Sequence, residues 1–250
     1  MKCLFIASAL ALVGSCSTQK YSTKVQNIKD SIEIVDSTLV IEYANSISSD
    51  ELKNHVYTIS DNSFEGRATG ELGQKLAANY IKSFYETRQI ASPIADSSYF
   101  QIIPDSYFPE NTATSENILA FIEGSEKSDE VIILSAHYDH LGITDDNLIN
   151  NGADDNGSGT SALLEMAEAF KLAESSGHGP KRSVLFLHLT AEEIGKFGSK
   201  FYTENPVFPL DNSVCNLNID MIGRIDDQHI NNKNYIYLIG SDKLSNELHY

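Results

Sequence analysis

Three short runs of almost uninterrupted apolar residues are the strongest constraint on the fold of this chain. They cover residues 117–122, 131–136 and 184–189, with polar or turn-forming residues between them. Runs of this length without alternation are typical of strands buried on both faces of a sheet. Two later runs, residues 214–219 and 235–239, have the same character. We therefore expect these five runs to form one buried sheet.

A helical pattern separates the second run from the third. Apolar residues between Leu163 and Phe170 share one face, and Ser158 or Thr160 could cap the first turn. Residues 71–86 carry a second amphipathic pattern after a glycine-rich turn. Because strand, helix and strand follow in that order, a right-handed crossover is expected. The predicted fold class is α/β, with a mostly parallel central sheet flanked by helices.

Length and charge narrow the class of protein. The chain has 250 residues, of which 41% are hydrophobic, enough for one sizeable core. Its formal net charge is -17, whereas a nucleic-acid-binding protein needs a cationic face. Binding to nucleic acid is therefore not expected. An acidic surface is typical of an exported protein and could also attract cationic substrates.

The N-terminus has the pattern of an export signal. Met1 and Lys2 precede an apolar run over residues 3–13 that is too short to span a membrane. Residues 13–16 resemble the lipobox of bacterial lipoproteins, in which cleavage before the cysteine leaves Cys16 acylated. The expectation is a signal peptide over residues 1–15 and a protein anchored by lipid to the bacterial cell envelope. The alternative is an ordinary secretory signal in which Cys16 has no role.

The rest of the chain divides into a tether and one domain. Residues 16–46 are rich in Ser, Thr, Asp and Lys, as in a tether, and residues 47–250 are expected to form the domain. With Cys3 removed and Cys16 lipidated, only Cys215 would remain. No intrachain disulfide is then expected, and Cys215 is interpreted as a packing residue.

Side chains able to bind a metal follow the expected strands or precede the expected helix. In open α/β sheets, ligand sites collect outside the carboxyl ends of the strands. So many like charges at one edge would require a cation. The sequence therefore predicts a metal centre drawn from the following residues: His137, Asp139, Asp154, Asp155, Glu192, Glu193 and Asp220.

The types of donor indicate which metal and which chemistry. Nitrogen and oxygen donors without cysteine suit Zn²⁺ in a hydrolytic site. A metal-bound histidine usually donates its other ring nitrogen to a carboxylate, a role open to Asp139 beside His137 if the strand bends there. Of the adjacent Glu192 and Glu193, one can bind metal while the other accepts a proton from water.

Five blocks lie in order between Glu65 and Arg224. They are EGR with Gly70 and Gly73, AHYDHLG at residues 136–142, GADDNGSG at residues 152–159, AEE at residues 191–193 with Gly198-Ser199, and NIDMIGR at residues 218–224. In these blocks the chain resembles the zinc aminopeptidases of metallopeptidase family twenty-eight. That family includes bacterial leucyl aminopeptidases, aminopeptidase Y and, more distantly, glutamate carboxypeptidase and glutaminyl cyclase.

The resemblance implies a zinc-dependent exopeptidase fold, of the phosphorylase/hydrolase-like kind, with two zinc ions. The implied metal ligands are His137, Asp155, Glu193 and Asp220. Asp155, rather than Asp154, would bridge the ions, His137 and Asp220 would bind the first, and Glu193 the second.

The resemblance also implies catalytic roles. Glu192 would be the general base, and Asp139 would orient His137. Members of the family carry a cis peptide after the bridging aspartate, which corresponds here to Asp155-Asn156. His140 lies within a motif but outside the family's ligand set, and it is interpreted as structural.

The end of the chain departs from the family pattern. The second zinc of the family requires a further histidine downstream, and residues 241–250 instead resemble the start of a helix. The domain is therefore expected to be incomplete at its C-terminus, and the 250-residue form to bind at most one zinc tightly. The other histidines have no motif around them and are expected in surface or packing roles: His55, His178, His188, His229 and His249.

The resulting hypothesis is a metal-dependent aminopeptidase that removes N-terminal residues from peptides with water activated by two zinc ions. The alternatives are another amide hydrolase or a glutaminyl cyclase on the same scaffold, which metal stoichiometry would separate, and a binding domain without catalysis. The side-chain preference and the oligomeric state do not follow from the sequence.

Overall fold

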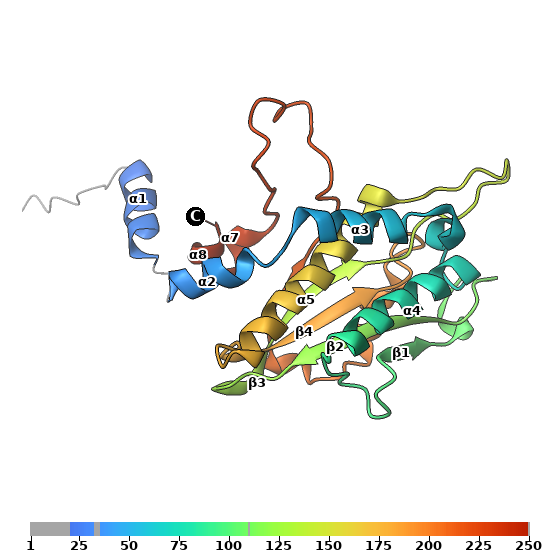
Figure 1. The fold of residues 1–250 in the computed structure, drawn as a ribbon, viewed down its shortest axis with the longest axis horizontal. Helices are drawn as coiled ribbons and strands as arrows, with labels where there is room; N and C mark the ends of the chain where they lie inside the picture. Colours follow the sequence, from blue (N-terminus) through green and yellow to red (C-terminus); the bar gives the residue numbers. More distant parts are fainter. Residues whose placement is uncertain (1–20, 33–35, 110, 250) are drawn as a thin grey trace, which may run out of the picture. The chain divides into compact units, whose positions relative to one another are not determined.

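A computed structural model describes residues 21–32, 36–109 and 111–249 (Figure 1). The chain forms two compact units, one over residues 36–236 and one from residues 1–35 together with residues 237–250. Each unit is described by itself. The predicted signal peptide and Cys16 lie outside the described residues.

The larger unit is built on a five-stranded mixed sheet with the strand order β1-β2-β4-β3-β5. Its strands are β1 (Phe100–Ile103), β2 (Ser115–Ile122), β3 (Lys127–His137), β4 (Arg182–Leu189) and β5 (Ser213–Asn218). β3 runs parallel to β4 and β5, whereas β2 pairs antiparallel with both β1 and β4. The α/β class and the flanking helices are confirmed. The sheet itself is mixed, with the parallel half on the side that carries β3.

Four of the five apolar runs form strands, namely β2, β3, β4 and β5. The prediction was wrong for residues 235–239, which form no strand. Ile236 and Ile239 are 69% and 96% exposed, so the pairing and burial that stabilise a strand are not in place there. β1 was missed because it is a short edge strand containing a glutamine and the half-exposed Ile102.

Helices cover both faces of this sheet. α3 (Ser49–Ile59), α4 (Leu72–Thr87) and α5 (Gly159–Ser175) lie over one face in Figure 1. Alternate residues of β2 point to opposite faces: Ile118 and Ala120 join the core beneath these helices, whereas Leu119 belongs to the core that contains Tyr202 of α6 (Phe197–Glu204). The helices predicted over residues 71–86 and after Ser158 are confirmed.

A short helix and several turns complete the larger unit. α2 (Ser37–Ala44) lies within the segment predicted to be a tether. Tight turns span Asn62–Arg67, Asp105–Tyr107 and Leu210–Asn212, and an irregular turn spans Ala153–Ser158 just before α5. The Ser158 hydroxyl does not cap α5 but donates to the Asp154 carbonyl at 2.7 Å.

The described part of the smaller unit consists of α1 (Tyr21–Ser31), α7 (Ser241–Leu244) and α8 (Asn246–His249). The helix start predicted after residue 240 is thus present as two short helices. Nδ1 of His249 lies 3.0 Å from the Ser241 hydroxyl. Among the described helices of the whole chain, none has the length and apolar character needed to cross a membrane.

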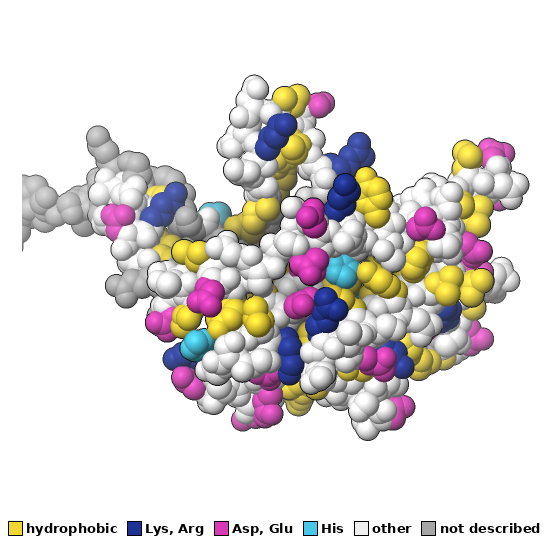
Figure 2. Space-filling model, in the orientation of Figure 1, with side chains coloured by type: hydrophobic (Ala, Val, Ile, Leu, Met, Phe, Trp, Pro, Cys, Tyr) yellow, Lys and Arg dark blue, Asp and Glu magenta, His cyan; other side chains and the backbone are white. Residues whose placement is uncertain are grey.

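The chain has 35 acidic and 18 basic residues, which give it an excess of negative charge. Figure 2 shows acidic and basic side chains interleaved over the visible face of the larger unit, with hydrophobic side chains among them.

Candidate metal centre

The last residue of β3, His137, is the centre of the site. Its Nε2 atom lies 3.2 Å from Oδ1 of Asp155 and 3.5 Å from Oδ1 of Asp220. Asp155 comes from the turn before α5, and Asp220 follows β5. Three chain segments that are distant in sequence therefore bring together one imidazole and two carboxylates, the residues that the resemblance assigns to the first zinc.

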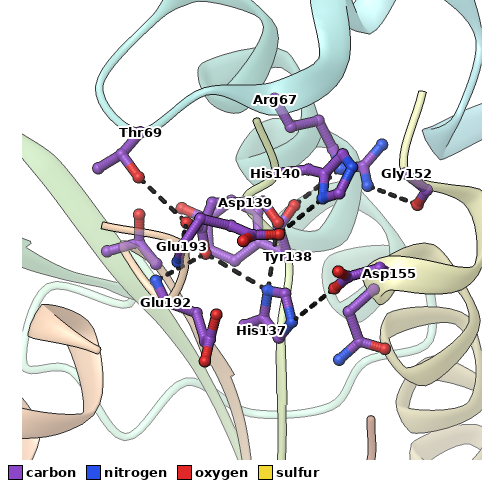
Figure 3. A network of polar contacts seen from close by, with 12 residues as sticks. Arg67, Thr69, His137, Tyr138, Asp139, His140, Gly152, Asp155, Glu192 and Glu193 are labelled. Carbon is purple, nitrogen blue, oxygen red and sulfur yellow. Dashed lines mark hydrogen bonds and ion pairs between the residues drawn. The ribbon is translucent and has the colours of Figure 1, made fainter. Parts of the chain in front are cut away.

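Glu192 and Glu193 follow β4 and complete the cluster from another direction. In Figure 3, Glu192 and Asp155 lie on opposite sides of His137. One donor atom from each of His137, Glu192 and Glu193 lies within 4.8 Å of the other two. The same holds for His137 with Asp155 and Asp220, and for His140 with Asp155 and Glu193. All four predicted metal ligands thus belong to connected groups at one edge of the sheet.

Asp139 is fully buried and serves mainly as an anchor for the Glu192-Glu193 turn. Its carboxylate accepts hydrogen bonds from the backbone N–H groups of Glu192 at 3.1 Å and Glu193 at 3.3 Å, and from the Thr69 hydroxyl at 3.1 Å. Nδ1 of His137 lies 3.2 Å from the backbone carbonyl of Asp139 but 3.6 Å from its carboxylate. The chain therefore orients the His137 ring mostly through the Asp139 carbonyl.

The neighbouring aspartates Asp154 and Asp155 point to different partners. Oδ1 of Asp154 accepts from the backbone N–H of Gly223 at 2.8 Å, whereas Asp155 faces His137. This placement agrees with Asp155 as the metal-binding member of the pair. The peptide bond between Asp155 and Asn156 is cis, as the resemblance implies.

Asn156 connects the start of α5 to the segment that carries Asp220. Its amide donates to the Ile219 carbonyl at 2.9 Å, and its Oδ1 accepts from the backbone N–H groups of Gly159 at 3.0 Å and Met221 at 3.3 Å. The residues on both sides of Asp220 are therefore held by one buried side chain. The role of Asn156 was not predicted from the sequence, although its position directly after the candidate ligand Asp155 was a signal.

Arg67 is the second residue whose role was missed. Its side chain is fully buried and donates only to backbone carbonyls, those of Ile59, Tyr138, Asn151 and Gly152, at 2.7–2.8 Å. Burial lowers the pKa of Arg67 to about 10, although Asp139, Asp155 and Glu193 oppose that shift, so the guanidinium remains charged at neutral pH. The signal was its place in the EGR motif.

The electrostatics of the site favour a bound cation. Burial lowers the pKa of His137, but the carboxylates of Asp139 and Asp220 outweigh burial and raise the pKa to about 10. A group of carboxylates that stabilises an imidazolium to this extent would also stabilise a metal ion. Burial also raises the pKa of Glu192, with Glu193 adding to the rise and His137 opposing it.

His140 was interpreted as structural, and the structure places it in the cluster. Its Nδ1 lies 2.7 Å from Oε1 of Glu193, and its side chain is 10% exposed. By contrast, His229 and His249 belong to none of the possible metal-binding groups formed by the described residues. His55 and His188 are buried in hydrogen-bonded packing positions, as expected, with Tyr80 and Tyr85 as partners.

The donor set fits zinc. It consists of imidazole nitrogens and carboxylate oxygens that converge at distances which a bound ion could close, and Cys215 is remote from it on β5. A cavity of about 710 Å³ opens beside this cluster. Its wall includes His140 and Asp155 together with apolar side chains such as Leu52, Val56 and Met221. The cluster can therefore be reached by a molecule larger than water.

Curated proteins of similar sequence include peptidases of more than one kind. A probable glutamate carboxypeptidase, AMP1 of Arabidopsis thaliana, is 39% identical over 105 residues, which are 42% of this chain and 14% of that protein. The aminopeptidase YwaD of Bacillus subtilis is 35% identical over 112 residues, which are 44% of this chain and 22% of that protein. The chain thus spans less than a quarter of the length of either relative.

Solved structures share the fold. BSAP, a zinc aminopeptidase from Bacillus subtilis, superposes with a TM-score of 0.56 at 15% sequence identity, covering 71% of this chain and 70% of that one. The model of peptidase family M28 matches residues 117–245, which include every predicted metal ligand and more than half of the chain. The chain therefore belongs to peptidase family M28.

Proposed function

We propose that this protein is a zinc-dependent aminopeptidase that hydrolyses the first peptide bond of peptides. The observation that carries the proposal is the convergence of His137, Asp155 and Asp220 with the Glu192-Glu193 pair beside a cavity. His137, Asp155 and Asp220 would supply three protein ligands, which is the number that an open catalytic zinc site has. The similarity to the aminopeptidase YwaD supports this reaction.

The positions of the side chains support the proposed metal-binding roles. His137, Asp155 and Asp220 would hold the first ion, and Glu193 with a share of Asp155 would hold the second. Bound zinc supplies Lewis acidity, which polarises a carbonyl and lowers the pKa of an attacking water. A two-ion centre is favoured because Asp155 belongs to two different groups of donors.

Glu192 is the proposed general base. Its backbone is fixed by the buried carboxylate of Asp139, and its side chain is 29% exposed, so it faces both the cluster and solvent. A carboxylate with a raised pKa takes a proton from water and returns it to the leaving amine more readily than an unperturbed one. Glu193 is adjacent, but it is engaged by His140 and is therefore assigned to metal binding.

The substrate would approach through the cavity next to Asp155. Its wall combines apolar side chains with Lys53 and Arg224. Such a wall suits a peptide, whose side chains can be apolar or polar and whose backbone carries carbonyl groups.

The proposal is tested by turnover of leucine p-nitroanilide with zinc-loaded protein, before and after a chelator. Metal-dependent release of nitroaniline supports the aminopeptidase. No release from any aminoacyl anilide, with conversion of an N-terminal glutamine peptide to its pyroglutamyl form, would indicate a glutaminyl cyclase instead. Failure of both reactions with metal bound would favour a binding domain.

We also propose, from residues 1–16 alone, that the protein is exported and held at the cell envelope by a lipid on Cys16. The support is the short apolar run followed by a lipobox-like segment. Peptides outside the cytoplasm would then be its substrates.

A further inference from the structure

We propose that Lys53 and Arg224 bind a carboxylate of the substrate, so that the enzyme prefers peptides with a negative charge close to the cleaved bond. The inference rests on the proposed aminopeptidase function and deepens it by naming a class of substrate. The carboxylate can belong to the C-terminus of a very short peptide or to an acidic side chain. Both sources present the same group to the same two cations.

The first support is the position of Lys53 on α3. Four residues of this helix, spaced three and four apart along one face, line the cavity: Ser49, Leu52, Lys53 and Val56. His55 is instead buried against α4 and α5. The Lys53 ammonium lies 5.5 Å from the centroid of the Tyr57 ring, which also lines the cavity. Lys53 therefore belongs to the face of α3 that borders the cavity.

The second support is the backbone that leads into Arg224. The N–H of Gly223 donates to Oδ1 of Asp154 at 2.8 Å, and the N–H of Ile222 donates to a hydroxyl in the same turn at 3.1 Å. Asp154 directly precedes the candidate metal ligand Asp155. The segment before Arg224 is thus tied to the turn that serves the metal centre. Arg224 ends the NIDMIGR block, and the metal centre itself gives it no role.

The third support is that the chain does not neutralise these two cations. Within the described part of the chain, neither Lys53 nor Arg224 forms an ion pair. Apart from His140, the other titratable groups of the cavity wall are Asp154 and Asp155. Once a metal ion offsets Asp155, the wall carries more positive than negative charge. A cavity of that sign attracts an anion, although the chain as a whole has a net charge of -17.

The chemistry of the wall suits a carboxylate in particular. A guanidinium presents a planar fork that matches both oxygens of a carboxylate, and an ammonium is a compact point charge. Leu52, Val56 and Met221 share the wall with the two cations. Apolar surroundings strengthen a charge pair relative to the same pair in water.

The fourth support is distance. The cavity has a volume of about 710 Å³, and Asp155 lines it together with both cations. A compact space of that volume is about 11 Å across, which is the length of about three residues of an extended peptide. A peptide held at the metal centre can therefore reach the cations only with a charge on the cleaved residue or within about two residues after it.

The test compares ligands that differ only by the replacement of a carboxylate with an amide. Leucyl-glycine against leucyl-glycinamide reports on the C-terminal carboxylate, and glutamyl p-nitroanilide against glutaminyl p-nitroanilide reports on an acidic side chain. Dissociation constants are measured by calorimetry on the zinc-loaded full chain with Glu192→Gln, which should bind these ligands without hydrolysing them. The acid of at least one pair should bind about tenfold more tightly than its amide, a usual gain from a hydrogen-bonded charge pair.

Substitutions in the same background locate the cause. Lys53→Met and Arg224→Met should each reduce the preference, and the double variant should have none, whereas Arg224→Lys should retain part of it. Lys181→Met is the matched control, because Lys181 precedes β4, pairs with Glu126 at 3.0 Å and does not line the cavity. It changes the net charge equally and should keep the preference. Added salt should weaken the preference, since both cations are exposed.

The proposal is overturned if neither acid binds more tightly than its amide. It is also overturned if the preference persists in folded Lys53→Met/Arg224→Met, with folding checked by circular dichroism. Because the readout is binding, either result holds whether or not the protein hydrolyses peptides. The proposed aminopeptidase function is tested separately by metal-dependent turnover of leucine p-nitroanilide, which carries no carboxylate.

Discussion

At the scale of single residues, the neighbours Glu192 and Glu193 have different surroundings. Both backbone N–H groups bind the carboxylate of Asp139, which fixes the turn. Glu193 then contacts His140 at 2.7 Å, whereas the ion pair of Glu192 with the ammonium of Lys196 is longer, at 3.8 Å. The proposal therefore assigns proton transfer to the less engaged carboxylate, that of Glu192.

We therefore expect Glu192→Gln to keep its zinc and to lower kcat by about 10²- to 10⁴-fold, the usual contribution of proton transfer. Glu193→Gln is the matched control and should lose an ion. The measurements are the zinc content and the rate of aminoacyl anilide hydrolysis. Near-normal kcat in Glu192→Gln, or equal loss of zinc in both variants, would reverse the assigned roles.

Arg67 acts on stability. In Arg67→Ala, the buried carbonyls that accept from Arg67 would lose their hydrogen-bond donor. Each unsatisfied buried group destabilises the folded state by about 1–3 kcal/mol. We expect the free energy of unfolding to fall by about 4 kcal/mol or more in denaturant titrations. Arg88→Ala is the control, because Arg88 makes a half-exposed ion pair with Glu168 and should cost about 1 kcal/mol or less. A similar loss in both variants would contradict the account.

At the scale of elements, three helices meet at one buried polar group. His55 of α3 contacts the Tyr80 hydroxyl of α4 at 2.6 Å and Oε1 of Glu165 of α5 at 3.1 Å. Burial, and then the nearby Glu51 and Glu168, raise the pKa of Glu165 to about 7. Burial lowers the pKa of His55, with Arg88 adding to the shift. The contact between these helices is therefore most favourable when Glu165 is protonated.

This raised pKa predicts how stability depends on pH. Glu165 binds its proton more tightly in the folded state than in the unfolded state, where the pKa is 4.5. Its contribution is complete below pH 4.5 and is lost as the pH rises to about 7. Glu165→Gln should remove this part of the pH dependence. As the pH is raised from 5 to 8, the free energy of unfolding of Glu165→Gln should increase relative to that of the wild type by on the order of 1–3 kcal/mol.

The measurement is urea unfolding of metal-free protein at both pH values. Glu174→Gln is a control on the same helix, since its side chain is 36% exposed and should leave the pH dependence unchanged. If the stability of the wild type does not fall relative to that of Glu165→Gln between pH 5 and pH 8, Glu165 is ionised in the folded protein at lower pH than proposed.

The elements also show what could be predicted from the sequence. β2, β3 and β4 were predictable because strands buried on both faces are continuously apolar, and α4 and α5 because their apolar residues repeat with helical period. The antiparallel pairing of β2 with β4 was not, since pairing depends on contacts between distant residues. The same reason explains the error at residues 235–239.

For the site, residue types and order indicated seven candidates, and the resemblance to the family singled out His137, Asp155, Glu193 and Asp220 among them. What was missed depends on side-chain direction. A sequence does not show that His140 turns toward Glu193 or that Asn156 reaches the backbone on both sides of Asp220. Both residues lie within motifs, so their presence was visible although their contacts were not.

At the scale of the whole molecule, the fold brings distant parts of the sequence to one edge of a sheet. The EGR turn and the ends of β3, β4 and β5 each contribute, and Arg67 connects the first two. Export would place this assembled site outside the cytoplasm. The proposed anchor is Cys16.

We expect Cys16→Ser to release the protein from membranes into the soluble fraction, because a covalent lipid contributes about 0.8 kcal/mol per buried CH₂. The measurement is fractionation of cells that express the full chain, with mass spectrometry of the N-terminal peptide. Membrane association that persists in Cys16→Ser, with no lipid on the wild type, would favour an ordinary secretory signal.

The central claim is that the carboxyl ends of the strands form a zinc site around His137. Anomalous diffraction at the zinc absorption edge, from crystals of the zinc-loaded protein, tests this most directly. The account predicts a peak about 2.0–2.2 Å from Nε2 of His137 and from carboxylate oxygens of Asp155 and Asp220. A zinc peak only at other residues, or none near His137 in a protein whose activity requires zinc, would contradict it.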